Sequence, residues 1–145
     1  MERQEIIHTL RQYRKLHAEC QRLRQRIVER RDSMYDIQAV VTGSANVRSG
    51  EIADRVERVV ESLDSMADYY TRRLLEAEEA ERRIVELIDL IDDNDEHAVL
   101  MLHYIDGKSF ADISELIYLS ERTVFYRHKS AISRLCAFAD GVIPE

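Results

Sequence analysis

Two long segments of this sequence repeat apolar residues at alternating intervals of four and three positions, and this pattern constrains the fold more than any other feature. In the segment from Ile52 to Ile91 every position of the repeat except Arg73 is apolar. The positions are Ile52, Val56, Val59, Leu63, Met66, Tyr70, Arg73, Ala77, Ala80, Ile84, Leu87 and Ile91. Such a heptad pattern predicts an α-helix with one apolar seam. At about 1.5 Å per residue this helix would be about 60 Å long, and it needs a partner to cover the seam.

The N-terminal segment offers such a partner, because the same spacing is apolar at nine of eleven positions there. The positions are Ile6, Thr9, Tyr13, Leu16, Cys20, Leu23, Ile27, Arg30, Met34, Ile37 and Val41. Between the two segments lies GSANVRSG, Gly43 to Gly50, which holds two of the four glycines and has no periodicity. We therefore expect residues 1–93 to form a long antiparallel helical hairpin, a coiled coil, that reverses in this loop.

The two segments of the expected hairpin differ in charge. Residues 1–31 hold nine Arg or Lys against four Asp or Glu, residues 32–107 hold seven against nineteen, and residues 108–145 balance at five against five. Opposite charge favours the pairing, but exposed ion pairs contribute only about 0.2–1 kcal/mol each, so the apolar seam must supply most of the stability. Because a two-helix hairpin buries little surface by itself, we expect a homodimer formed through residues 1–93. The sequence leaves open whether the seam pairs within one chain or between chains.

The basic run RLRQRIVERR, Arg22 to Arg31, has two interpretations. It is either a solvated helix face that pairs with acidic residues, which is the interpretation we favour, or a nucleic-acid-binding helix. The net charge of −7 does not exclude a nucleic-acid site elsewhere in the chain. A phosphate responds to the local potential within about 8–10 Å rather than to the total charge.

Turn-forming residues are scarce, since the 145 residues include four glycines and one proline. The fold class that we predict is therefore all-α. The first thirty residues hold no apolar run of signal-peptide or membrane length, so we expect a cytoplasmic protein with no membrane partner. Cys20 and Cys136 lack the spacing of a zinc site or a disulfide framework, and we interpret both as small buried hydrophobic residues.

The C-terminal part, residues 94–145, is predicted to contain three helices. The run DDND, Asp92 to Asp95, can cap a short helix that ends at Asp106-Gly107. Ser109 and Ser120 can cap the two helices that follow. The stretch SFADISELIYLSERTVFYRHK, Ser109 to Lys129, then has the form of a helix-turn-helix.

A helix-turn-helix requires small or apolar residues where its two helices meet. The interior positions here are Ile113, Ser114, Ile117, Leu119, Val124 and Arg127. Arg127 departs from this pattern, although its aliphatic stem can line the edge of a core. Tyr118 is the second departure, because it occupies the turn position where glycine usually adopts a left-handed conformation, which costs another residue about 1 kcal/mol or more.

The run MLHYIDGKSFADISELIYLSERTVFYRHKSAISRL, Met101 to Leu135, resembles region 4 of sigma-70 factors. It is most similar to the sigma-like domain of phage-encoded late-gene transcription regulators of the ArpU type. In LSERTVFYRHKSAI the capped start, the Thr-Val pair, the aromatic residues and the following Arg look like that family's recognition helix. The resemblance implies a region 4-like domain over residues 94–145 that binds double-stranded DNA and controls transcription of phage or prophage genes, without enzymatic activity.

The side chains expected to contact DNA lie on the helix face opposite Val124, Ala131, Ile132 and Leu135. They are Glu121, Arg122, Phe125, Tyr126 and Lys129. Arg122 can bond a guanine edge, Phe125 can contact a thymine methyl group, and Tyr126 and Lys129 suit phosphates or base edges. The candidate DNA-binding set also includes Lys108 and Ser109, which can hold a phosphate, and the helix-start and motif residues Ser120, Thr123 and Arg127. Phe125 and Tyr126 have an alternative interpretation as residues that pack against another helix.

No catalytic or cofactor motif is present in the sequence. The five histidines lack metal-ligand spacing, and no nucleophile elbow, phosphate loop or paired carboxylates are found, so we expect neither an enzyme nor a cofactor nor a metal. Two alternatives to a transcription regulator stay open. One is a small terminase-like DNA-packaging protein, and the other is a coiled-coil adaptor that binds RNA polymerase.

Overall fold

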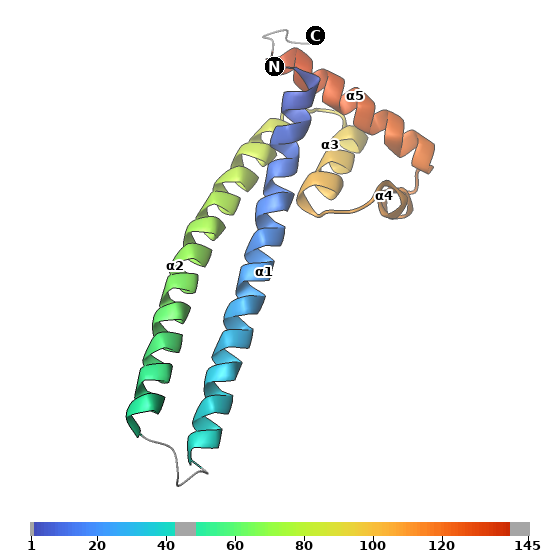
Figure 1. Cartoon of the computed structure of the whole chain (residues 1–145). Helices are drawn as coiled ribbons and strands as arrows, with labels where there is room; N and C mark the ends of the chain where they lie inside the picture. Colours follow the sequence, from blue (N-terminus) through green and yellow to red (C-terminus); the bar gives the residue numbers. More distant parts are fainter. Residues whose placement is uncertain (1, 43–48, 140–145) are drawn as a thin grey trace. The chain divides into compact units, whose positions relative to one another are not determined.

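The computed structural model describes the backbone of residues 2–42 and 49–139, and the side chains of residues 2–36 and 50–139. The described chain is helical and contains no strand within these ranges (Figure 1). Its helices are α1 (Arg3–Thr42), α2 (Ser49–Ile88), α3 (Asn94–Leu100), the π-helical turn η1 (Met101–Ile105), α4 (Phe110–Ile117) and α5 (Glu121–Ala139). The predicted all-α fold is therefore confirmed. The predicted reversal loop falls largely on residues 43–48, which lie outside the described ranges.

The chain divides into two compact units. One contains residues 17–75, and the other contains residues 1–16 together with residues 76–145. The beginning of α1 and the end of α2 therefore belong to the same unit as the C-terminal helices. We predicted a boundary after residue 93 between a part for oligomerisation and a part for DNA binding, and this boundary stays a prediction.

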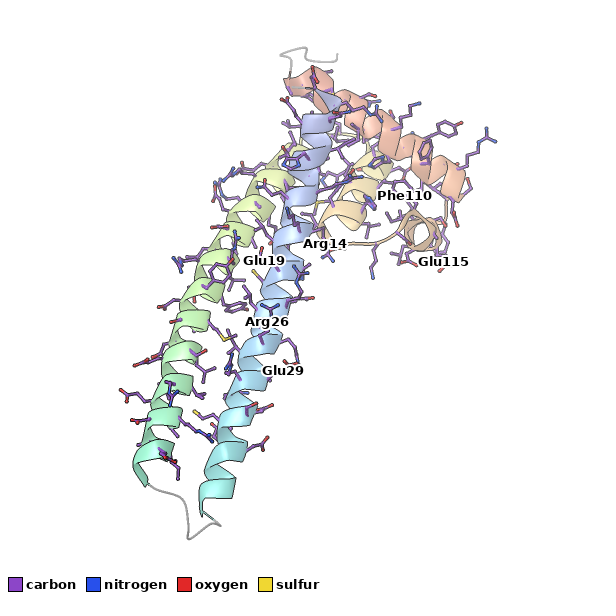
Figure 2. All side chains as sticks on the ribbon, viewed as in Figure 1. Arg14, Glu19, Arg26, Glu29, Phe110 and Glu115 are labelled. Atoms are coloured by element: carbon purple, nitrogen blue, oxygen red, sulfur yellow. The ribbon has the colours of Figure 1, made fainter. Side chains whose placement is uncertain are left out.

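In the unit of residues 17–75, the apolar seam explains why α1 and α2 pack on each other. Cys20 and Leu23 are buried on α1, and the seam positions of α2 from Ile52 to Tyr70 are all partly buried. Arg73 interrupts the apolar seam of α2, and the structure gives the reason. Its Nε lies 3.1 Å from Oε1 of Glu19 on α1, and the same carboxylate oxygen accepts a hydrogen bond from Tyr69 Oη at 3.2 Å. Figure 2 labels Glu19 on α1.

The larger unit is built around a core to which four segments contribute. Its buried members are Ile6 and Leu10 of α1, Ile84, Ile88 and Ile91 from the end of α2, Leu100 and Tyr104, and Ala131, Ile132 and Leu135 of α5. Full burial of one aliphatic side chain of this size contributes about 1.5–3 kcal/mol, so this cluster is the main source of stability in the unit. The heptad pattern thus continues into the core of the C-terminal helices.

Helix α2 ends earlier than its apolar pattern. It stops at Ile88, and a short turn follows in which the N–H of Ile91 donates to the carbonyl of Ile88 at 3.0 Å. Ile91 is nevertheless only 4% exposed, because the turn directs it into the core. Asp93 then caps α3, as predicted, by accepting a hydrogen bond from the N–H of Glu96.

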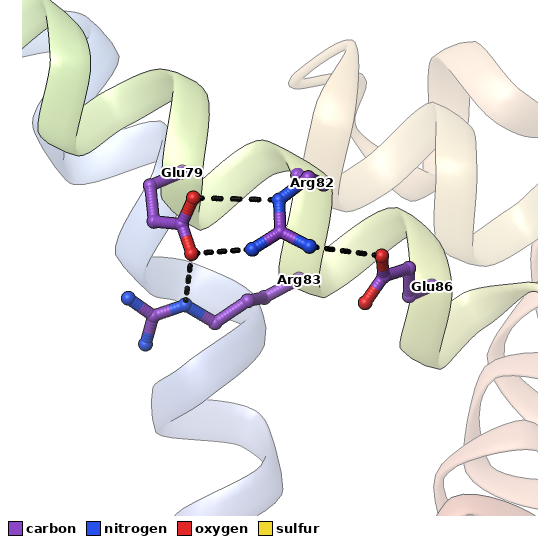
Figure 3. A network of polar contacts seen from close by, with 4 residues as sticks. All are labelled: Glu79, Arg82, Arg83 and Glu86. Atoms are coloured by element: carbon purple, nitrogen blue, oxygen red, sulfur yellow. Dashed lines mark hydrogen bonds and ion pairs between the residues drawn. The ribbon is translucent and has the colours of Figure 1, made fainter.

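The acidic exposed face of α2 forms ion pairs within the helix. Arg82 bonds Glu79 three residues before it at 2.6 Å and Glu86 four residues after it at 3.1 Å, and Arg83 also contacts Glu79 (Figure 3). The hydrogen bond from Arg82 lowers the pKa of Glu79, and Glu79 in turn raises the pKa of Arg82. All four residues are at least partly exposed to solvent, and such pairs add helix stability of a few tenths of a kcal/mol each.

Candidate DNA-binding site

The first helix of the predicted helix-turn-helix is α4, and it begins where the sequence indicated. Ser109 is its N-cap, with extended backbone, and its Oγ accepts a hydrogen bond from the N–H of Asp112 at 3.2 Å. The loop before it is held by two further bonds. The N–H of Lys108 donates to the carbonyl of Leu102 at 2.9 Å, and Nδ1 of His103 donates to the carbonyl of Lys108 at 2.8 Å. The residues that precede α4 are therefore held by the turn η1.

The turn between α4 and α5 is built on Tyr118. This residue has φ 57° and ψ 37°, the left-handed conformation predicted for it, and its N–H donates to the carbonyl of Ser114. The N–H of Leu119 also donates to this carbonyl, at 3.2 Å. A left-handed residue with such bonds is the usual way in which a helix ends its hydrogen-bond ladder.

The interior of the helix-turn-helix also follows the prediction. Ile113 and Val124 are fully buried and pack with Val99 of α3 in a small core. Phe110, Ile117, Leu119 and Leu102 pack against that core and are partly buried. Arg127, the exception among the interior positions, is partly buried too. The angle between α4 and α5 is therefore fixed by apolar contacts.

Helix α5, the predicted recognition helix, is capped by Ser120, whose Oγ accepts a hydrogen bond from the N–H of Thr123 at 3.1 Å. The hydroxyl of Thr123 lies 2.8 Å from the same Oγ, so its side chain is part of the cap. Further along, Glu96 of α3 is 1% exposed and holds α5 in place. Its carboxylate accepts a hydrogen bond from Ser130 Oγ at 2.7 Å and lies 3.0 Å from Nε of Arg134.

One face of α5 is buried and the opposite face is exposed, as predicted. Val124, Ala131, Ile132 and Leu135 are all fully buried. Phe125 and Tyr126 are 49% and 52% exposed, and their rings lie 5.7 Å apart. The guanidinium of Arg122 lies over the Tyr126 ring at 5.7 Å, a cation–π contact that limits the orientations of the arginine.

The structure brings most of the predicted site residues to exposed positions. Glu121, Arg122, Phe125, Tyr126 and Lys129 are exposed along α5, and Lys108, Ser109 and Ser120 are exposed at the starts of the two helices. Thr123 and Arg127 are partly buried, and Thr123 contributes to the helix cap. This is the arrangement that a helix needs in order to enter a major groove with its N-terminal half. Whether these side chains contact DNA stays a prediction.

Residues 93–135 match the family model described as Sigma-70, region 4. The match begins at Asp93, the cap of α3, and ends at Leu135, the last buried residue of α5. This kind of domain binds DNA in transcription regulation and is not enzymatic. No curated protein and no solved structure matches the chain.

Within this region 4-like segment, a ring cluster joins η1 to α5 and was not anticipated from the sequence. Tyr104 Oη and Nε2 of His128 are hydrogen-bonded at 2.7 Å, and the rings of His103 and Phe110 pack beside them. Burial, together with the smaller effects of the nearby charges of His103, Arg3 and Arg11, lowers the pKa of His128 to about 4. Burial also raises the pKa of Tyr104. His128 is thus neutral near pH 7, and in the tautomer that carries its proton on Nδ1 its Nε2 can accept a hydrogen bond from the tyrosine hydroxyl.

Outside the region 4-like segment, sequence reasoning missed two basic residues of α1. Arg11 and Arg14 lie beside the loop that precedes α4, and Arg14 Nη1 donates to the carbonyl of Ile105 at 3.3 Å. The excess of Arg and Lys in residues 1–31 was the available signal, but it could not say which of them reach the C-terminal helices.

The helices and the acidic, histidine and cysteine side chains of residues 2–42 and 49–139 show neither a membrane span nor a metal cluster. No helix there is long and apolar enough to cross a membrane. No group of three or more His, Cys, Asp or Glu side chains is placed to hold a metal ion among the residues whose positions are given.

Proposed function

We propose that this chain is a sequence-specific DNA-binding regulator of transcription that acts on phage or prophage genes and has no enzymatic activity. The observation that carries the proposal is the exposed face of α5. It combines a region 4-like helix-turn-helix with an ordered row of cationic and aromatic side chains. The opposite face of the same helix is fully buried, so the exposed row is held at a fixed rotation.

The exposed residues suit different parts of a DNA duplex. Arg122 lies in the first turn of α5, where a guanidinium can form two hydrogen bonds with a guanine edge. Lys129 lies two turns further along and suits a phosphate. Phe125 is half-exposed beside Tyr126, which leaves part of its ring free to contact a thymine methyl group.

The phage or prophage setting rests on the resemblance of Met101–Leu135 to late-gene regulators of the ArpU type. RNA polymerase is a second proposed partner, since sigma-like domains act in transcription. A coiled-coil adaptor that binds RNA polymerase without reading DNA is the competing function. A small terminase-like packaging protein is the third, although in that class the DNA-binding part commonly precedes the oligomerisation part.

The hairpin is proposed to form a homodimer. Its seam in the unit of residues 17–75 is only partly covered, and apolar residues repeat every seven positions on an exposed face of α2. These residues are Ala53, Val60, Ala67 and Leu74. A second copy would cover this face, and paired copies would bind two half-sites with matching symmetry.

Footprinting of the full chain on fragments of its parent genome tests the proposal. We expect protection of a defined site, loss of that protection in Arg122→Ala, and its retention in Arg26→Ala. Arg26 is a suitable control because it is exposed on α1, away from the helix-turn-helix in the sequence (Figure 2). If no fragment is protected, the adaptor function replaces the DNA-binding one. If Arg122→Ala protects the same site as the wild type, α5 is not the element that reads the sequence.

A further inference from the structure

A small cavity on the larger unit is lined by basic side chains from α1 and from the loop before α4. Its volume is about 340 Å³, and it is open to solvent. Arg11 and Arg14 line it from α1, and Lys108 and Ser109 line it from the loop and the start of α4. His103, Tyr104 and Gly107 complete the lining.

The charge of this lining contrasts with the charge of the chain. Three side chains that are always or normally cationic meet at one cavity, and none of its lining residues is acidic, although the chain has a net charge of −7. Asp106 precedes Gly107 in the sequence but does not line the cavity. Like charges in a shared site repel one another, so such a group is stabilised when an anion enters it.

The position of Arg14 is fixed by the loop. Its Nη1 donates to the carbonyl of Ile105 at 3.3 Å, and its guanidinium rests against Gly107. A Cβ atom on residue 107 would lie 2.5 Å from Cζ of Arg14, and the φ of +72° also favours glycine there. Glycine is therefore the residue that allows the guanidinium to lie against the backbone. Since a guanidinium has five N–H donors, Arg14 retains donors for a ligand.

The loop side of the cavity offers further donors in a fixed geometry. Ser109 Oγ already accepts the N–H of Asp112, so its own proton is free to be donated. The backbone of Lys108 is held at both its N–H and its carbonyl, which fixes the point from which its flexible side chain extends. The positive end of the α4 dipole lies at the same point, and the Asp112 carboxylate in the first turn of α4 offsets part of it.

Ring contacts link the wall of the cavity to α5. The ring of Phe125 lies 6.5 Å from that of Phe110, and the ring of Phe110 lies 4.8 Å from that of His103 in the cavity wall. In a helix-turn-helix the first helix crosses the DNA backbone while the second lies in the major groove, so a duplex bound by α5 is expected to bring its backbone to the start of α4, where Lys108 and Ser109 line the cavity.

We propose that Arg11, Arg14, Lys108 and Ser109 form a binding site for one backbone phosphate of the DNA bound by α5. The N-terminal helix would then be part of the DNA interface, although it lies outside residues 93–135. This inference rests on the proposed function and adds to it the contribution of α1. The phosphate fixes the register of the duplex and carries no sequence information.

The test compares two double variants of the full chain that lose equal charge from the same helix. Arg11→Ala with Arg14→Ala removes two of the three cationic groups of the proposed site, and Arg3→Ala with Lys15→Ala removes two exposed basic residues of α1 that do not line the cavity. Affinity for a random-sequence duplex is measured by anisotropy at several salt concentrations. Loss of one phosphate contact should weaken binding about 15-fold at about 0.05 M salt and about fourfold at about 0.2 M. The slope of log K against log salt should fall in magnitude by about 0.9.

The control double variant should change the slope much less. Equal weakening by both double variants would overturn the proposal, because it would mean that only the total charge of α1 matters. The single variant Arg11→Ala controls for misfolding, because Arg11 is exposed and its removal should leave the fold intact. This variant should also weaken DNA binding. A circular dichroism spectrum and an unfolding midpoint for each variant complete the controls.

The outcomes separate this inference from the proposed function. If Lys129→Ala weakens DNA binding and the Arg11 and Arg14 variants do not, the function stands and the phosphate site is wrong. If the wild type binds no duplex, both fail. A titration with inorganic phosphate, followed by the NMR resonance of the Gly107 amide, shows whether the site binds free phosphate. A shift of that resonance without any loss of DNA affinity in the double variant would mean a free-phosphate site, and would overturn the DNA assignment.

Discussion

Tyr118 ends α4 in a left-handed backbone conformation, and the residue is 93% exposed. A residue with a Cβ atom pays about 1–2 kcal/mol for this backbone geometry, and the exposed ring recovers little of it through packing. The left-handed backbone of this turn therefore lowers the free energy of unfolding, and the apolar contacts between α4 and α5 must offset that loss. Glycine at this position would remove the steric cost.

Tyr118→Gly is accordingly expected to raise the free energy of unfolding by about 1 kcal/mol. Tyr118→Ala is the matched variant, since it removes the ring and keeps the Cβ atom. Urea unfolding measures both. An alanine variant that gains as much stability as the glycine variant would show that the ring, rather than the backbone, is unfavourable.

His128 should make stability depend on pH. Burial lowers its pKa to about 4, with His103, Arg3 and Arg11 adding to the effect, and unfolding returns the pKa to about 6.5. The unfolded state then binds the proton more readily, so the contribution to stability is complete above pH 6.5 and declines as the pH falls toward 4. We expect the stability difference between wild type and His128→Gln to narrow from about pH 7 to about pH 5. A difference that stays constant would contradict this assignment.

The position of α5 depends on Glu96 of α3, whose buried carboxylate bonds Ser130 and pairs with Arg134. Arg134→Ala leaves this carboxylate with one partner, and the arginine is 48% exposed, which reduces the loss. We expect a decrease in unfolding free energy of about 1–2 kcal/mol. Lys129→Ala serves as the control on the same helix, since Lys129 is exposed and should leave stability unchanged. Equal effects of the two substitutions would mean that the pair with Glu96 contributes nothing.

At the scale of the elements, the features that could be predicted from the sequence are those set by residues close together in the chain. Ser109, Ser120 and the DDND run cap helices because short polar side chains bond free N–H groups within the same few residues. The heptad spacing predicted that Cys20 is buried. The place of Tyr118 in the turn, where glycine is usual, predicted its left-handed backbone conformation. These features need no knowledge of distant contacts.

Contacts between distant parts of the chain could not be predicted in this way. The burial of Ile6 and Leu10 against α5, and the approach of Arg14 to Gly107, depend on which segments meet in three dimensions. The hydrogen bond between Tyr104 and His128 likewise joins residues twenty-four positions apart. A repeat of apolar residues predicts that a face is covered but does not name the element that covers it.

For the molecule as a whole, we predict that two copies of the chain associate through the helical hairpin. Leu63→Asp places a charge in the partly buried seam and should lower stability by roughly 2–3 kcal/mol and weaken the dimer. Ser65→Asp adds the same charge at an exposed position and should do neither. Sedimentation of the full chain is the appropriate measurement, because Ile84 and Ile88 pack in the same core as α5 and a truncated hairpin would expose them. A monomeric wild type at micromolar concentrations would contradict the dimer.

The central claim is that α5 reads DNA sequence, and binding titrations of Arg122→Ala and Lys129→Ala test it most directly. Each variant is titrated with the protected genomic site and with a random duplex over a range of salt concentrations. Arg122→Ala should cost about 1–3 kcal/mol on the specific site and little on random DNA. Lys129→Ala should weaken both equally and reduce the salt slope by about one. Unchanged affinity of both variants for every fragment, with circular dichroism showing intact helices, would contradict the claim and identify the exposed face of α5 as a protein-binding surface.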